Sequence, residues 1–208
     1  MTKKIIGICG FIGSGKDTAA DYLVDFYEFQ RDSFAASLKD IVAAVFGWDR
    51  SLLEGRTSEA REWREQIDPW WADRLGIKDL TPRWVLQYWG TEVCRRSFHN
   101  DIWIASLENR LRRSENTNIV ISDCRFPNEV TAIKKSGGKV IRIVRGENPP
   151  WYNDALIHNS TADSTLMQTK WAEIHASEWA WIGTEFDHVV DNNGELKNLY
   201  LQLAEIVR

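Results

Sequence analysis

The sequence has few cysteines, no excess of basic residues and no long hydrophobic run. Its three cysteines, in 208 residues, form no C-x-x-C pair and no metal-ligand spacing, which argues against a disulfide framework and favours a reducing compartment. No apolar run is long enough for a membrane span or a signal-peptide core. Since the formal net charge is −4, a strongly basic nucleic-acid footprint is also absent. We therefore expect a cytoplasmic protein without a membrane or nucleic-acid partner.

The remaining composition is that of a globular protein. Hydrophobic residues make up 43% and charged residues 27% of the chain, whose length suits one domain over residues 1–208. Tryptophan is the unusual residue, with 11 copies gathered mainly in 48–89 and 151–181. We interpret these tryptophans as packing residues of a core or an interface.

Short apolar runs alternate with amphipathic segments along the chain. The runs predict strands at 5–9, 119–122, 140–144 and 187–191, and a further strand could lie at 29–34. The amphipathic segments predict helices at 17–26, 38–46, 83–96, 102–113, 128–135 and 196–207. In the second helix Leu38, Ile41, Val42 and Val45 are expected on one face. Residues 48–81 read as helical insertions, and 146–185 as irregular with a helical part at 166–181. This order predicts an α/β fold with a parallel sheet covered on both faces.

A P-loop motif lies between the first strand and the first helix. Gly10-Phe11-Ile12-Gly13-Ser14-Gly15-Lys16 satisfies G-x-x-x-x-G-K in the strand–turn–helix context that the motif requires. Its glycines let backbone N–H groups turn toward a phosphate, and the helix directs its positive end at the same anion. We expect ATP to bind at Gly10, Ile12, Gly13, Ser14 and Gly15, with Lys16 at the β- and γ-phosphates.

The residue after Lys16 departs from the general motif. A serine or threonine usually contacts Mg²⁺ there, whereas this chain has Asp17 followed by Thr18. Asp17 either holds the ion, directly or through water, or leaves that role to Thr18. It is equally explained as an acid of the first helical turn, where the helix dipole favours negative charge.

Charged residues follow two later strands. Asp123, after the strand 119–122, stands where a magnesium-organising carboxylate belongs, and Arg125 could neutralise charge on a transferring phosphoryl group. A surface ion pair at a strand end is the alternative. Arg145 ends the strand 140–144 on the expected ligand side, so we favour it for phosphate contact, whereas Arg142 alternates with apolar residues and is expected to face solvent.

Several segments together resemble the bacteriophage deoxynucleoside monophosphate kinases. The matches are Gly15-Lys16-Asp17-Thr18, Phe34–Lys39, Arg83–Gln87 with Gly90-Thr91-Glu92 and Trp103, Asp123–Glu129, His175-Ala176-Ser177-Glu178 and Asn192-Asn193-Gly194. They run in order over nearly the whole chain. The P-loop alone is shared by many families, but the ordered set is specific.

The resemblance implies the nucleoside monophosphate kinase fold, with five parallel strands and the P-loop after the first. It implies transfer of a phosphoryl group from ATP, with Mg²⁺, to a deoxynucleoside monophosphate, in a host cytoplasm if the protein is viral, and it suggests a homodimer. The acceptor would be bound by a helical region near 48–100 and by residues elsewhere: Lys39, Arg83, Gln87, Thr91, Arg125, Glu129, His175 and Glu178. Asn192 would lie near adenine.

Kinases of this type close an arginine-bearing lid, but the lid-like segment 146–183 contains no arginine and one lysine, Lys170. Either Arg125 and Arg145 act from the core, which we favour, or Lys170 replaces the arginine, or the lid mainly excludes water. Two other functions remain open: a kinase of another small metabolite such as dephospho-coenzyme A, and a nucleotide-dependent switch. His99, His158 and His188 have no partner pattern and read as structural or exposed.

Overall fold

The computed structural model describes residues 3–161 and 164–208, so Ala162 and Asp163 of the lid-like segment lie outside the described residues. The chain forms two compact units. The first unit comprises Met1–Ser33 and Arg113–Arg208, and the second unit comprises Phe34–Arg112. In the part of the chain that the structure describes, no helix is both long and apolar enough to cross a membrane.

The first unit is built on a five-stranded parallel sheet, as predicted. Its strands are β1 (Lys4–Cys9), β2 (Gln30–Asp32), β3 (Asn118–Cys124), β4 (Lys139–Val144) and β5 (His188–Asp191), in the spatial order β2-β3-β1-β4-β5. β1 is central, and its last residue, Cys9, pairs with Cys124 of β3 and Arg142 of β4. The loop after β1 is therefore flanked by the carboxyl ends of both neighbouring strands, where ligands of such sheets bind.

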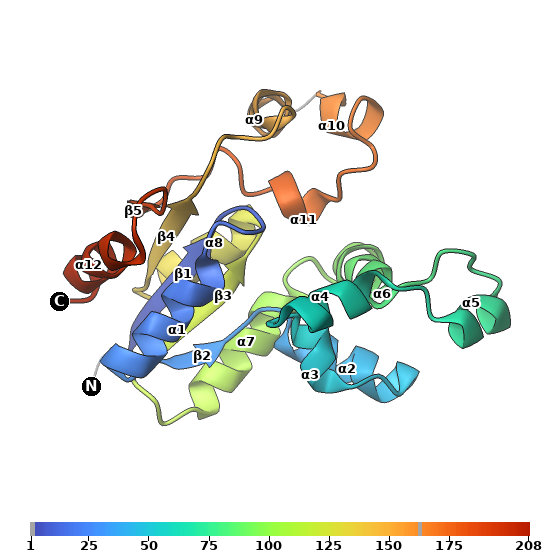
Figure 1. Cartoon of the computed structure of the whole chain (residues 1–208), viewed down its shortest axis with the longest axis horizontal. Helices are drawn as coiled ribbons and strands as arrows, with labels where there is room; N and C mark the ends of the chain where they lie inside the picture. Colours follow the sequence, from blue (N-terminus) through green and yellow to red (C-terminus); the bar gives the residue numbers. More distant parts are fainter. Residues whose placement is uncertain (1–2, 162–163) are drawn as a thin grey trace. The chain divides into compact units, whose positions relative to one another are not determined.

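Helices cover both faces of this sheet (Figure 1). On one face α1 (Lys16–Tyr27) and α12 (Leu196–Val207) pack on β1, β3, β4 and β5 through a core that includes Ile8, Leu23 and Leu203. On the other face lies α8 (Pro127–Lys135), whose Ile133 approaches β1 closely. A Cβ at Gly7 would lie 2.5 Å from the Ile133 methyl carbon, so the glycine permits this packing.

The lid-like segment contains more helix than expected. It forms α9 (Tyr152–Ser160), α10 (Leu166–Thr169) and α11 (Ala176–Trp179) (Figure 1). The prediction of irregular structure is wrong for α9, because this helix buries only Ala155 and so shows little apolar periodicity. The helical prediction for 166–181 is confirmed only at its two ends.

The second unit consists of helices, including the helical insertions predicted at 48–81. Its elements are α2 (Ala36–Phe46), α3 (Arg50–Glu54), α4 (Ser58–Glu65), α5 (Pro69–Leu75), α6 (Pro82–Tyr88), the π-helix η1 (Trp89–Arg96) and α7 (Ile102–Arg113). Side chains of Asp49, Thr57 and Asp68 cap the three short helices α3, α4 and α5. The helix predicted at 83–96 thus changes to π geometry at Trp89, and the Gly90 carbonyl accepts a hydrogen bond from the Trp103 indole at 2.9 Å.

The apolar face of α2 differs from the prediction. Leu38 and Val42 are buried as expected, but Ile41 is 46% and Val45 50% exposed, and Phe46 is buried instead. The true stripe runs at a spacing of four residues, since α2 packs against α3 and α6 along one narrow line.

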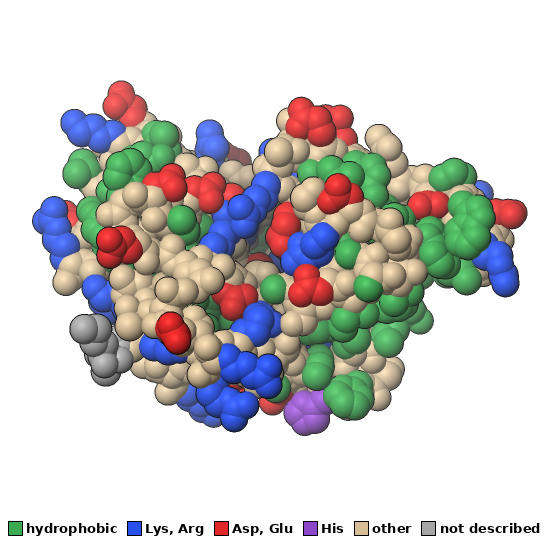
Figure 2. All heavy atoms as spheres, turned by 90° about the horizontal axis from the view of Figure 1, so that it is seen from below, with side chains coloured by type: hydrophobic (Ala, Val, Ile, Leu, Met, Phe, Trp, Pro, Cys, Tyr) green, Lys and Arg blue, Asp and Glu red, His purple; other side chains and the backbone are tan. Residues whose placement is uncertain are grey.

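Aromatic side chains form packed clusters, as the sequence predicted. In the second unit Phe46 contacts Trp48, Trp71 and Trp89 at ring-centroid distances of 4.4, 4.8 and 5.5 Å. Trp70, in contrast, is 61% exposed. Figure 2 shows hydrophobic side chains on the drawn face, lying between charged groups of both signs.

Candidate active site

The P-loop has the backbone conformation that its glycines allow. Gly10, Gly13 and Gly15 have φ angles of 143°, 78° and 102°, in the region that side chains disfavour. A Cβ at Gly10 would also lie 2.5 Å from the Ile143 carbonyl oxygen, and one at Gly15 would overlap the Asn192 amide. Both glycines are therefore required by conformation and by space.

Lys16 and Ser14 give this loop the character of an anion site. The Lys16 ammonium donates to the carbonyl oxygens of Gly10 and Phe11 at 2.8 and 2.6 Å. Burial, and then the positive charge of Arg125, lower the pKa of Lys16 to about 8. Ser14 Oγ is buried and has no hydrogen-bond partner within the described ranges. A phosphate in the loop would satisfy both groups, because it accepts hydrogen bonds and carries the opposite charge.

Asn192 holds the P-loop from the end of β5. Its side-chain amide donates to the Ser14 carbonyl oxygen at 2.8 Å, and its backbone N–H donates to Val144 at 2.8 Å. The next residue, Asn193, accepts from the Gly146 N–H at 2.7 Å. The turn after β5 thus supports the P-loop and the start of the lid-like segment; the expected contact of Asn192 with adenine stays a prediction.

Arg31, which the sequence analysis missed, binds Asp17. Its guanidinium donates to the carboxylate of Asp17, to that of Asp21 at 2.7 Å, and to Ser122 Oγ at 3.2 and 3.0 Å. Asp17 is exposed, as is Thr18. No spacing rule links an arginine of a short strand to an acid fourteen positions earlier, so only the fold reveals this contact.

Arg125 lies directly after β3, which runs two residues further than predicted and includes Asp123. Arg125 Nη1 donates to Glu178 Oε1 at 2.7 Å and to Ser177 Oγ at 3.5 Å. Although burial acts in the opposite direction, the Glu178 carboxylate raises the pKa of Arg125, so the guanidinium is charged. The D-x-R and H-x-S-E segments are therefore in direct contact through one ion pair.

Glu129 has a structural role that the sequence did not predict. It is 2% exposed, and its carboxylate accepts from the backbone N–H groups of Arg125 and Phe126 at 2.7 and 3.1 Å. It thereby caps the start of α8, and its expected role at the substrate stays a prediction. His175 similarly caps α11, with Nδ1 accepting from the Ser177 N–H at 3.2 Å.

Comparison with known proteins identifies the family. No family model matches the chain. The chain is 34% identical over 155 residues to the "Putative deoxynucleotide monophosphate kinase" of Acanthamoeba polyphaga mimivirus, covering 68% of this chain and 74% of that protein. This chain belongs to the deoxynucleotide monophosphate kinase family. The deoxynucleoside-5'-monophosphate kinase of Escherichia phage T5 is 26% identical over 180 residues, covering 64% of this chain and 72% of the relative.

The resemblance found in the motifs is thus confirmed. The observed sheet, with the P-loop after its central strand, is the P-loop kinase fold expected of a deoxynucleotide monophosphate kinase. Solved structures similar to the chain include TT1252 from Thermus thermophilus, with 17% identity, TM-score 0.44 and coverage of 100% and 97% of the two chains. Dephospho-CoA kinase from Campylobacter jejuni has 13% identity, TM-score 0.47 and coverage of 99% and 96%.

Of the basic residues after the P-loop, Arg142 differs from expectation in this kinase, and the roles of Arg145 and Lys170 stay predictions. Arg142 does not face solvent: its guanidinium lies over the rings of Tyr152 and Trp181, 5.5 and 5.1 Å from their centroids, and donates to Tyr152 Oη at 3.2 Å. Arg145 is exposed and makes no hydrogen bond or ion pair with the described residues. Lys170 pairs with Asp154 at 2.8 Å.

Two of the acceptor residues expected in the second unit, Lys39 and Arg83, already form ion pairs there. Lys39 on α2 pairs with Glu54, whose pKa falls to about 2 because the charges of Lys39 and Arg50 outweigh the opposing effect of burial. Arg83 on α6 pairs with Glu65 at 2.6 Å. Gln87 is half-buried on α6 and Thr91 is buried on η1.

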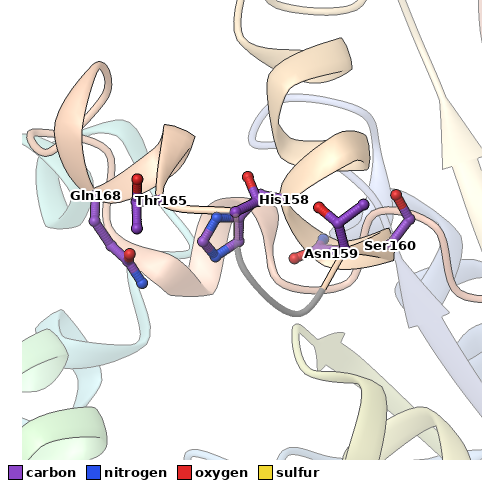
Figure 3. A pocket seen from close by; sticks show the side chains of 7 residues that line it. His158, Asn159, Ser160, Thr165 and Gln168 are labelled. Carbon is purple, nitrogen blue, oxygen red and sulfur yellow. The ribbon is translucent and has the colours of Figure 1, made fainter.

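A polar hollow of about 650 Å³ lies in the lid-like segment, and none of the predicted site residues lines it (Figure 3). Side chains from α9, from α10 and from the turn between them line it: His158, Asn159, Ser160, Thr161, Ser164, Thr165 and Gln168. His158 also packs edge-on against Trp179 at 4.9 Å, as its structural interpretation predicted.

Proposed function

We propose that this protein transfers the γ-phosphoryl group of ATP to a deoxynucleoside monophosphate, giving ADP and a deoxynucleoside diphosphate. The observation that carries the proposal is the P-loop itself, with the half-buried ammonium of Lys16 and the buried hydroxyl of Ser14 gathered at it, in a chain whose 34% identical relative is named for this activity. The donor triphosphate would lie along the loop, with its β- and γ-phosphates at Lys16.

The acceptor needs no strong general base. A phosphate monoester has its second pKa near 6, so at neutral pH its oxygen is already largely ionised and can attack the γ-phosphorus. Catalysis then depends on holding donor and acceptor in line and on neutralising the charge of the transferred group. The protein supplies this charge through Lys16 and Arg125.

Arg145 is our choice for the role of the missing lid arginine. It follows β4 beside the P-loop strand, and its charge is uncommitted among the described residues. Lys170 is a weaker candidate, because Asp154 neutralises it and its ammonium lies 5.2 Å from the Trp171 ring centroid. Arg145→Ala should therefore lower kcat by at least tenfold, while Lys170→Ala serves as the matched control; near-normal turnover of Arg145→Ala would reject this assignment.

We expect Mg²⁺ to bind near the loop together with the nucleotide, whose phosphates would supply part of its ligands. Among the described residues no group of three His, Cys, Asp or Glu side chains could hold a metal alone. Mg²⁺ is commonly held by substrate phosphates, water and one or two carboxylates, and the hard oxygens of Asp17, Thr18 and Asp123 suit that chemistry. When bound, the ion would neutralise phosphate charge, and Asp123 at the end of β3 is our choice for orienting it.

For the acceptor we retain Lys39, Arg83, Gln87 and Thr91, with Arg125, whose guanidinium the lid acid Glu178 now binds. Each of the three cations now binds a carboxylate: Glu54, Glu65 or Glu178. A dianionic phosphate would compete with those carboxylates for the same hydrogen-bond donors. Glu178→Gln should thus lower the KM for the acceptor severalfold by freeing Arg125, whereas an increased KM would mean that Glu178 itself contacts the substrate.

The direct test is release of ADP from MgATP in the presence of a panel of acceptors. The panel holds the four common deoxynucleoside monophosphates, dUMP, their ribose counterparts, modified pyrimidine forms and dephospho-coenzyme A. Turnover with deoxynucleotides above the acceptor-free rate supports the proposal and defines the accepted bases. Turnover with dephospho-coenzyme A alone, or slow hydrolysis that no acceptor stimulates, would replace it with a metabolite kinase or a nucleotide switch.

A further inference from the structure

The clamp formed by Arg31 is the least expected contact beside the P-loop. The Arg31 side chain is 13% exposed, while its partners Asp17 and Asp21 are 59% and 58% exposed. Ser122, which is buried on β3, accepts from both Nε and Nη2. The guanidinium is therefore anchored from the sheet side and directed at two acids on the first turns of α1.

The position of Asp17 raises an electrostatic problem for a triphosphate site. Asp17 follows Lys16 directly, at the helix end that would receive phosphates, and its charge has the same sign as theirs. Like charges a few ångströms apart repel strongly near a protein surface. An acid here is compatible with tight ATP binding only if a cation neutralises it.

We infer that Arg31 is a positioning residue that neutralises Asp17 and holds its carboxylate in place, so that ATP can bind beside an acid. This inference rests on the proposed function, because it concerns the same phosphate site. The Ser122 hydroxyl holds the guanidinium in place. Asp21 accepts a second hydrogen bond from the same guanidinium, but it lies one turn further along α1 than Asp17. Arg31 thus compensates for the departure of this P-loop from the usual serine or threonine.

The experiment measures the Kd of ATP by calorimetry, in EDTA and in excess Mg²⁺, for the wild type and matched variants. Arg31→Gln should weaken binding of metal-free ATP at least tenfold but binding of MgATP only about threefold, because Mg²⁺ halves the charge of the nucleotide and itself screens Asp17. Arg31→Lys keeps the charge and should lie between the two proteins. Melting temperatures of all variants are recorded in parallel.

A second substitution that restores ATP binding distinguishes an effect of the Asp17 charge from an effect of the net charge of the protein. Arg31→Gln with Asp17→Asn should return the Kd of metal-free ATP to within about threefold of the wild type. Arg31→Gln with Asp25→Asn has the same net charge, but Asp25 is an exposed acid further along α1, so this variant should stay weak. The two double variants differ only in which acid of α1 is removed.

Two results would overturn the inference. One is an Arg31→Gln variant with a lower melting temperature but unchanged affinity for ATP. The other is an Arg31→Gln variant that binds ATP equally weakly with and without Mg²⁺ and is not rescued by Asp17→Asn. That result would indicate a general loss of structure. If the wild type itself bound no ATP, the proposed function would fail, and this outcome is visible before any variant is compared.

Discussion

Phe11 joins the P-loop to both ends of the lid-like segment, so its removal should affect stability and nucleotide binding together. Its ring contacts Trp181, Trp151 and Tyr152, at centroid distances of 4.8, 5.6 and 6.1 Å. Aromatic pairs contribute about 0.5–1.5 kcal/mol each beyond the area that they bury, and contacts within one cluster are not additive. Phe11 is half-buried, so Phe11→Ala also loses the free energy of burying part of its ring, and we expect a total cost of about 2–3 kcal/mol.

At roughly 2–4 °C per kcal/mol for a chain of this size, that loss lowers the melting temperature by about 5–10 °C. Thermal unfolding followed by circular dichroism measures it, with Phe26→Ala as the control because Phe26 is 69% exposed on α1. Since Lys16 donates to the Phe11 carbonyl, the KM for ATP should rise as well. If both variants melted within 1 °C of each other and kept the wild-type KM, the aromatic contact would not support the loop.

Three further predictions concern the same unit. Lys16, with a pKa of about 8, should take up a proton when phosphate charge raises that pKa; ATP binding near pH 8.5 should thus take protons from the buffer and weaken at higher pH, whereas calorimetric heats independent of buffer ionisation would contradict this. Gly15→Ala should destabilise the protein more than Gly13→Ala, because both have positive φ but only the Gly15 Cβ meets a neighbour, the Asn192 amide; equal denaturation midpoints would refute the argument. Glu129→Gln should cost about 2 kcal/mol in urea unfolding by weakening two charged hydrogen bonds, and an unchanged midpoint would show that the cap is dispensable.

Much of the fold could be predicted because its signals are local. The closing helix 196–207 agrees with α12 at both ends, and all five strands overlap their predicted ranges, although β2 contains no apolar residue. The errors have a common cause. The helix α9 and the buried stripe of α2 depend on which neighbours each segment packs against, and periodicity in a single sequence cannot supply this information.

Recognition of the candidate site was uneven for a similar reason. The conformation of the P-loop and the position of Lys16 follow from a few consecutive residues between a strand and a helix, so the motif alone predicted the loop. Arg142 alternates with apolar residues along β4, and this pattern predicts that its side chain faces solvent. In the structure Tyr152 and Trp181, from both ends of the lid-like segment, cover that face.

The sequence by itself determined the phosphate loop, the parallel sheet and the family, since each is encoded in short segments whose conformation follows from neighbouring residues. Only the tertiary structure decided how the charged groups pair. Glu178 reaches Arg125 across 53 positions, and Asn192 reaches Ser14 across 178. Arg31 meets Asp17 only because β2 lies at the sheet edge beside β3. Such pairs form only when distant segments are brought together by folding, because a hydrogen bond or ion pair requires its two groups to lie a few ångströms apart.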